Sequence, residues 1–189
     1  MAELARPPAP QPVRPDGGQV RLPAHSLVIL DGSGGPPEVG ELAPDFELPS
    51  SGGGTIRLSD YRGQSAVVLY FYPKDNTPGC TTQACGIRDN LPRFEDENAV
   101  VLGVSMDDLE SHAEFIDDYD LNFPLLADTE GEVSEAYGVY GTHQFGDREY
   151  TGILRTTFVI DENGRITDVI KVQDVEGHAS DVLELLRLF

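Results

Sequence analysis

Hydrophobic residues along this chain form short runs and periodic segments that predict alternating strands and helices. Strands are expected at the apolar runs 66–72, 99–105, 123–126, 156–160 and 165–172, the last two forming a hairpin. Helices are expected at 77–97, 109–119, 130–137 and 178–189. This order predicts an α/β fold with a central mixed β-sheet flanked by helices.

The helix at 77–97 has a well-marked start and an unusual interior. Thr77 supplies a hydroxyl at the N-cap position, and Pro78 follows at the first helical position, where proline is favoured. Pro92 lies inside the helix and has no N–H group, so we expect it to kink or divide the helix. The chain therefore passes from the apolar strand 66–72 into this helix through a short loop.

Residues 1–37 differ from the rest of the chain. Eight of the 14 prolines lie in the first 40 residues, together with glycine clusters that interrupt regular structure. We expect a Pro/Gly-rich extension that is largely disordered, followed by one folded domain at 38–189. Within the extension, the apolar residues of Gln19–Leu30 indicate a strand or a docking segment.

The charge of the chain is strongly negative and narrows its partners. The chain has 33 acidic and 13 basic residues, which gives a net charge of −20. Such a field repels nucleic acid and anionic membrane surfaces, so we expect neither as a partner. The acidic, lysine-poor composition also resembles that of proteins from salt-loving organisms, where salt screens the self-repulsion. No apolar run reaches the length of a membrane span, and no signal-peptide pattern opens the chain, so we expect a cytoplasmic protein.

The two cysteines, Cys80 and Cys85, are the main chemical signal. In a reducing compartment, a cysteine pair is more often catalytic or metal-binding than a structural disulfide. A four-ligand zinc site would also need two nearby histidines. The histidines are scattered along the chain, at His25, His112, His143 and His178. We therefore expect no structural metal.

The position of Cys80 favours a reactive thiolate. Cys80 is the third residue of the expected helix, where unpaired N–H groups and the helix dipole stabilise negative charge. The alternative is a small buried hydrophobic residue, which is a common environment for a free cysteine. The preceding Pro78-Gly79 is expected to form an exposed turn, and this favours the reactive interpretation over the buried one.

The spacing of the two cysteines restricts how they can react together. On an intact helix, five residues correspond to a rise of about 7.5 Å and place the two Cα atoms about 8–9 Å apart. A disulfide needs Cα atoms closer than about 7 Å. Either Cys80 and Cys85 never pair, or the first turns of the helix unwind during the reaction.

Other cysteine chemistries fit the residues less well. A C-x-x-C reductase or isomerase closes its disulfide with little backbone change, which this spacing does not allow. A cysteine phosphatase needs an arginine six residues after its nucleophile, and those positions hold Gly86 and Leu91. A papain-like hydrolase would need His143 or His178 to be brought beside Cys80 by the fold.

A longer segment carries a resemblance to a known family. Residues 70–86 read Tyr-Phe-Tyr-Pro-Lys-Asp-Asn-Thr-Pro-Gly-Cys-Thr-Thr-Gln-Ala-Cys-Gly, which closely resembles the active-site segment of Q-type (bacterioferritin-comigratory) peroxiredoxins. Residues 41–46, 122–128 and 152–161 resemble the same family. The resemblance covers about residues 38–189. It implies a thioredoxin-like fold and a peroxidase for hydrogen peroxide and alkyl hydroperoxides that needs no metal, flavin or haem.

The family pattern P-x3-T-x2-C falls on Pro73, Thr77 and Cys80. The resemblance implies that Cys80 is the peroxidatic thiolate, which attacks the peroxide and becomes a sulfenic acid. Thr77 would hydrogen-bond and align the peroxide, and Pro73 would shield the thiolate from water. Arg155 matches the family's distant arginine, which stabilises the thiolate and the charge that develops on the leaving oxygen. Backbone N–H groups of Gly79 and Cys80 would complete the pocket.

The resemblance also assigns Cys85 as the resolving thiol, which forms a Cys80–Cys85 disulfide that a thioredoxin-like protein then reduces. Relatives of this type include monomers and dimers. Lys74 and Asp75 lie inside the motif without an expected chemical role. Two alternatives stay open: a general thiol-disulfide oxidoreductase, and a redox-sensing or chaperone-like binding module in which oxidation of the helix exposes a partner surface.

Overall fold

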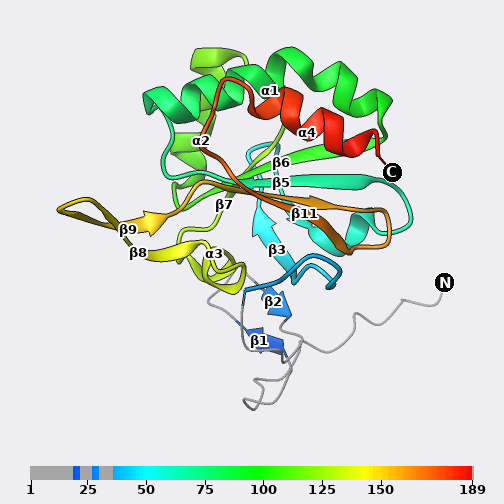
Figure 1. Ribbon diagram of the computed structural model, residues 1–189, viewed down its shortest axis with the longest axis horizontal. Coiled ribbons are helices and arrows are strands. Elements are labelled where there is room, and N and C mark those ends of the chain that lie inside the picture. Colours follow the sequence, from blue (N-terminus) through cyan, green and yellow to red (C-terminus); the bar gives the residue numbers. More distant parts are fainter. Residues whose placement is uncertain (1–18, 22–26, 30–35, 189) are drawn as a thin grey trace.

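The computed structural model describes residues 19–21, 27–29 and 36–188. Most of the expected extension at 1–37 therefore lies outside the described residues. A mixed five-stranded sheet forms the centre of the fold, in the order β11-β10-β5-β6-β7 (Figure 1). Its strands are β5 (Ala66–Phe71), β6 (Ala99–Ser105), β7 (Leu125–Ala127), β10 (Thr156–Ile160) and β11 (Ile166–Lys171). β5, β6 and β7 are parallel, whereas β10 runs antiparallel to both β5 and β11. The expected mixed sheet is confirmed.

Helices cover both faces of this sheet because side chains alternate along its strands. The helices are α1 (Pro78–Asp96), α2 (Leu109–Tyr119), α3 (Glu132–Ala136) and α4 (His178–Leu186). Val68 and Tyr70 of β5 belong to a core shared with α1, α2 and α4, and α4 packs against α1. Leu69 and Phe71 belong to a second core on the opposite face, where Tyr137 after α3 packs. All four expected helices are present, and none of the described helices is long and apolar enough to cross a membrane.

Four short strands form a second, antiparallel sheet in the order β1-β2-β3-β4. They are β1 (Gln19–Arg21), β2 (Leu27–Ile29), β3 (Asp45–Pro49) and β4 (Thr55–Arg57), and a 3-10 helix, η1 (Leu58–Tyr61), follows. β1 and β2 confirm strand structure within Gln19–Leu30. β3 was not predicted because only two of its residues, Phe46 and Leu48, are buried, which leaves a short periodic signal.

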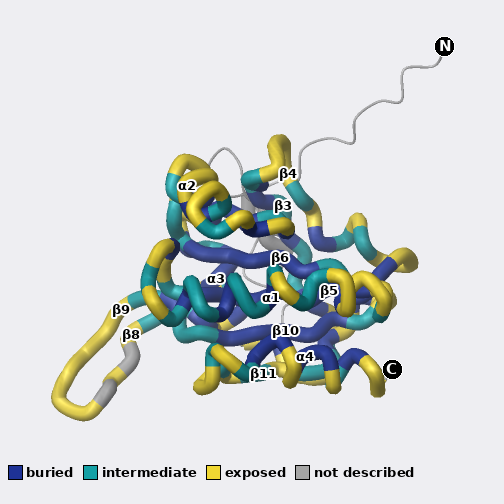
Figure 2. Tube along the Cα trace, turned by 90° about the horizontal axis from the view of Figure 1, so that it is seen from above, coloured by how far each residue is buried: buried dark blue, intermediate teal, exposed yellow. Residues whose placement is uncertain are grey.

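A two-stranded hairpin, β8 (Tyr140–Phe145) and β9 (Arg148–Ile153), also went unpredicted. Figures 1 and 2 show it projecting from the body of the domain, and most of its described residues are exposed. Exposed strands need no apolar alternation, so the sequence carries little signal for them. The hairpin leads directly to Leu154 and Arg155 and thus delivers this arginine to the start of β10.

Pro92 does not divide α1, and that part of the prediction is wrong. The helix runs continuously from Pro78 to Asp96 with Pro92 inside it. Proline has no N–H group to donate to the carbonyl four residues earlier, which belongs to Arg88. The side-chain amide of Asn122 donates to this carbonyl over 3.3 Å. A donor from outside the helix therefore replaces the missing hydrogen bond.

Candidate active site

α1 begins beyond the carboxyl end of β5, as the sequence predicted. Thr77 has extended backbone angles, and its carbonyl accepts the first helical hydrogen bond from the Thr81 N–H over 2.8 Å. The Thr77 side chain does not cap the helix, however, because its hydroxyl donates to the Lys74 carbonyl over 2.9 Å. The expected N-cap position is confirmed, and the expected capping role of the hydroxyl is wrong. The N–H groups of the first turn are thus left to other acceptors.

Cys80 is buried, with 2 % of its surface exposed, and it belongs to the core shared by α1 and α4. Pro78 is exposed, but the expected exposure of the turn does not extend to the thiol. Burial alone does not make Cys80 a simple core residue, because Nη2 of Arg155 donates to its Sγ over 3.2 Å. A cation thus lies against the sulfur, at the start of a helix where negative charge is favoured.

Gly79 lets the guanidinium of Arg155 approach this closely. A Cβ atom at Gly79 would lie 3.1 Å from Nη2 of Arg155, closer than about nine in ten observed Cβ contacts, so the guanidinium would have to shift by a few tenths of an ångström. The backbone of Gly79 does not have a positive φ, so the glycine is needed for space and not for conformation. The tertiary structure therefore brings together Gly79, Cys80 and Arg155, which the sequence had proposed as one site. Pro73 and Thr77 flank them, both half-buried, on the loop before α1.

A chain of buried polar groups continues behind Arg155. Nη1 of Arg155 donates to Oε1 of Gln83 over 2.6 Å, and Nε2 of Gln83 lies 3.4 Å from Nδ1 of His178. Nε2 of His178 lies 2.8 Å from the hydroxyl of Thr157. Burial, and then the positive charge of Arg155, lowers the pKa of His178 to about 4. The site thus contains a polar network that was not predicted from the sequence.

This network bears on His178 as a candidate base for a papain-like hydrolase. Both ring nitrogens of His178 are engaged by Gln83 and Thr157, so His178 is not the base that a papain-like hydrolase would place beside Cys80. The other candidate, His143, lies on β8, and its side chain is outside the part of the structure that is described.

Cys85 lies on the same helix as Cys80 and is half-buried. Both cysteines are free thiols, and α1 is continuous between them. Helical geometry holds their Cα atoms about 8–9 Å apart, beyond the reach of a disulfide. The structure is therefore that of a reduced pair, and direct bonding between the sulfurs requires the helix to open.

A second buried network anchors the loop that carries Pro73 and Thr77. Its centre is Asp75, which is 5 % exposed. The Asp75 carboxylate accepts from the Tyr72 hydroxyl over 2.6 Å and from the Ser111 hydroxyl over 2.9 Å, and it lies 2.7 Å from Nδ1 of His112. The backbone N–H of Asp75 donates to Asp107 over 2.8 Å. These contacts fasten the loop to α2 and to the turn before it, a role that the sequence did not indicate for Asp75.

Tyr150 lies on β9 and is partly exposed. Burial, and then the negative charge of a Cys80 thiolate, raises the pKa of the Tyr150 phenol. Gly152 leaves room for the ring, because a Cβ atom there would lie 2.5 Å from the phenol oxygen. The projecting hairpin therefore carries a phenol that interacts electrostatically with Cys80. No sequence signal pointed to Tyr150, because it belongs to an exposed strand.

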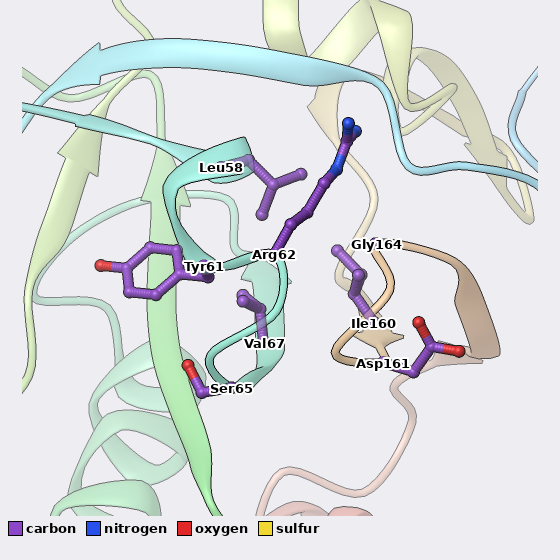
Figure 3. Close-up of a pocket in the computed structure, with 8 residues that line it drawn as sticks. All are labelled: Leu58, Tyr61, Arg62, Ser65, Val67, Ile160, Asp161 and Gly164. Carbon is purple, nitrogen blue, oxygen red and sulfur yellow. The ribbon is translucent and has the colours of Figure 1, made fainter.

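A small pocket elsewhere in the molecule is unrelated to the cysteines (Figure 3). It is lined by Leu58, Tyr61, Arg62, Ser65, Val67, Ile160, Asp161 and Gly164. Its volume of about 10 Å³ is at the lower limit for one water molecule. Val67 and Ile160 pair near the start of β5, whereas Cys80 follows the opposite end of that strand. Among the described residues, no cluster of His, Cys, Asp and Glu is arranged to hold a metal ion.

Comparisons with known proteins point to one family. Residues 39–169 match the model of the AhpC/TSA family. The chain is 44 % identical over 150 residues to Peroxiredoxin Bcp of Bacillus subtilis, an alignment that covers 79 % of this chain and 95 % of that protein. It is similar to the crystal structure of peroxidoxin BcpB from Mycobacterium tuberculosis, with a TM-score of 0.72 and 36 % identity over 81 % of this chain and 98 % of that one.

A third similar protein is described by its activity. The bacterioferritin comigratory protein of Xanthomonas campestris has a TM-score of 0.70 and 34 % identity, covering 75 % of this chain and 90 % of that one. Its structure, a trapped intermediate/ligand complex, was solved for insight into the alkyl peroxide reduction activity of the Xanthomonas protein.

Proposed function

Because the chain belongs to the AhpC/TSA family and is a peroxiredoxin with a thioredoxin-like fold, we propose that Cys80 is the thiolate with which it reduces peroxides. The observation that carries this assignment is the 3.2 Å contact between Nη2 of Arg155 and Sγ of Cys80 at the start of α1. The sulfur attacks one peroxide oxygen, the O–O bond breaks, and Cys80 becomes a sulfenic acid. The other oxygen takes up a proton and leaves as water or an alcohol.

The surrounding groups stabilise the charge that moves during this step. Arg155 holds the thiolate and then the developing negative charge on the leaving oxygen. N–H groups of Gly79 and Cys80, which the Thr77 side chain does not engage, bind the peroxide oxygens. Thr77 aligns the peroxide through its hydroxyl, and Pro73 shields the sulfur from water. The bond of Thr77 to the Lys74 carbonyl supports this role, because it directs the hydroxyl hydrogen away and leaves the oxygen lone pairs to accept from the peroxide.

Cys85 completes the cycle as the resolving thiol. Its sulfur attacks the sulfenic sulfur of Cys80, a disulfide forms, and water leaves. A thioredoxin-like dithiol then returns both cysteines to the reduced state by supplying two electrons and two protons. Since α1 holds the cysteines apart in the reduced form, the first turns of the helix must unwind before the disulfide can close.

Hydrogen peroxide and alkyl hydroperoxides are the proposed substrates, and the named activity of the Xanthomonas relative supports the second class. The reductant is a thioredoxin-like protein in the cytoplasm, and the enzyme acts as a monomer or dimer. The catalytic domain spans 38–189, and residues 1–37 form an N-terminal extension to it.

Replacement of each cysteine separates the two proposed roles. With dithiothreitol as reductant, Cys80→Ser is expected to consume no peroxide, whereas Cys85→Ser keeps turning over because the small thiol reduces the sulfenic acid directly. With a thioredoxin system, Cys85→Ser is expected to lose turnover. Activity in Cys80→Ser would overturn the assignment of the peroxidatic thiol.

Mass spectrometry of the peroxide-treated protein tests the disulfide. The expected product is one chain that has lost two hydrogens and yields a peptide linked through Cys80 and Cys85. A linkage between two chains, or a sulfenic acid that persists in the wild type with Cys85 reduced, would contradict Cys85 as the resolving residue.

A further inference from the structure

We propose that His178 is a positioning residue of this active site: acting through Gln83, it fixes the guanidinium of Arg155 against Cys80 and fastens the part of α1 that must unwind to α4. The proposal rests on the proposed function for its kinetic consequences. The directions of the buried hydrogen bonds do not depend on that function, because they follow from the contacts among Arg155, Gln83, His178 and Thr157.

The direction of each bond in this network follows from Arg155. A guanidinium only donates, so the atom of Gln83 that faces Nη1 at 2.6 Å must be the amide oxygen. The NH2 group of Gln83 then points at Nδ1 of His178, which lies 3.4 Å away and must accept. The ring hydrogen is therefore on Nε2 and is donated to the Thr157 hydroxyl over 2.8 Å. His178 is neutral, in one defined tautomer.

The environment of the ring agrees with this assignment. His178 is 2 % exposed, and Gln83 is 1 % exposed, so neither side chain is solvated. Burial and the nearby charge of Arg155 both act against the imidazolium, whose pKa is lowered to about 4. A proton on Nδ1 would make His178 a donor opposite the NH2 group of Gln83, which is also a donor. The Gln83 amide would then have to rotate, and its oxygen would no longer accept from Arg155.

The network joins three parts of the fold at one place. Cys80 and Gln83 are three residues apart on α1 and so lie on the same face, where the Arg155 guanidinium contacts both. Arg155 extends β10, since its carbonyl accepts from the Val172 N–H over 3.0 Å. Thr157 lies two residues further along the strand, on the same face of the sheet. His178 is the first residue of α4 and closes the arrangement from the other side.

The position of Gln83 couples this network to opening of the helix. Gln83 lies between Cys80 and Cys85, so the turn that carries it must unwind before the two sulfurs can meet. Unwinding breaks its bonds to Arg155 and His178. The same contacts that hold Arg155 in place for the peroxide step thus favour the closed helix and slow disulfide formation.

Two replacements of His178 distinguish positioning from packing. His178→Leu fills similar volume but leaves the Gln83 amide without an acceptor, and we expect the rate of Cys80 oxidation by peroxide to fall about tenfold. Disulfide formation from the sulfenic acid is expected to become faster. His178→Asn supplies an oxygen near the place of Nδ1 and is expected to restore most of the peroxide rate.

Val182→Ala is the matched control, because Val182 is a fully buried residue of α4 outside the network. It weakens the packing of α4 without removing an acceptor, so the peroxide rate should stay near that of the wild type. The proposal is overturned if His178→Leu and Val182→Ala slow the peroxide step equally, or if His178→Asn restores nothing.

Nitrogen-15 NMR of His178 tests the bond directions without peroxide or turnover, so it separates this proposal from the proposed function. In the wild type we expect Nε2 to carry the hydrogen and Nδ1 to stay unprotonated down to about pH 5. In Gln83→Glu the carboxylate can only accept, and His178 is expected to become an imidazolium at neutral pH. A hydrogen on Nδ1 in the wild type, or a ring that stays neutral at pH 7 in Gln83→Glu, would overturn the proposal.

Discussion

Gly79→Ala should separate stability from activity, because the new methyl group would press on the guanidinium of Arg155. The added Cβ would lie 3.1 Å from Nη2 and 3.9 Å from Cζ of Arg155. The guanidinium cannot move freely, since it is bonded to Gln83 at 2.6 Å and to the Cys80 sulfur at 3.2 Å. The least strongly held of these contacts is the one to sulfur, so we expect the shift of a few tenths of an ångström to lengthen it.

The size of the effect follows from the strength of that contact. A hydrogen bond to a charged group contributes about 1.5–3 kcal/mol, and losing about half of it would slow the peroxide step roughly 3- to 15-fold. Alanine is also a better helix former than glycine, by about 0.5–1 kcal/mol. The variant should therefore be at least as stable as the wild type, within about 1 kcal/mol, although it reacts more slowly with peroxide.

Two measurements test this prediction. Urea unfolding is followed by circular dichroism, since the chain has no tryptophan, and the peroxide step is followed by competition with a haem peroxidase. Gly86→Ala is the matched control: it lies on the same helix, and a Cβ there meets nothing within 4 Å. We expect Gly86→Ala to gain stability and keep the wild-type peroxide rate. A folded Gly79→Ala with an unchanged rate, or an equal loss in Gly86→Ala, would refute the reasoning.

Three further predictions concern the buried networks and the hairpin. His112→Ala removes one of the three side-chain partners of the buried Asp75 carboxylate and should lower the free energy of unfolding by about 1–3 kcal/mol. Asp75→Asn should cost much less, since an amide can still accept from Tyr72 and donate to Nδ1 of His112; equal costs in urea unfolding would contradict this. The pKa of His178 is lowered from 6.5 to about 4, so the unfolded state takes up a proton first as pH falls through this window. At 1.36 kcal/mol per pKa unit, His178 alone should lower the free energy of unfolding by about 3 kcal/mol between pH 6.5 and pH 4. The His178→Leu variant should lack this contribution to the pH dependence of stability. Tyr150→Ala should slow reduction of a bulky aromatic hydroperoxide about 3- to 10-fold more than that of hydrogen peroxide, and equal effects on both would count against a substrate contact.

Much of the fold was predicted from patterns among residues that are close in sequence. The apolar runs at β5 and β6 are buried on both faces, and such runs are recognisable without knowledge of their neighbours. The start of α1 was predicted from Thr77 and Pro78 because capping preferences depend on adjacent residues only. The exposed hairpin β8–β9 and the short strand β3 gave weak patterns, since few of their side chains are buried.

Contacts between distant residues escaped prediction for a different reason. Asp75 and His112 are 37 residues apart, and Gln83 and His178 are 95 residues apart. The residue types do not indicate that either pair is in contact, because the sequence does not distinguish a buried aspartate or histidine from an exposed one. The uninterrupted helix at Pro92 is a further case, since the replacement donor, Asn122, comes from a loop outside α1.

The sequence by itself determined that Cys80 heads a helix, that Cys85 follows on it, and that the two cannot bond until the helix opens. These are consequences of local geometry, which depends on spacing and capping alone. The family resemblance already assigned Arg155 to the Cys80 thiolate, and only the tertiary structure decided that Cys80 is buried and that Gln83 and His178 hold the arginine in place. Burial and hydrogen bonding of this kind arise when strands and helices pack, which no local stretch of sequence contains.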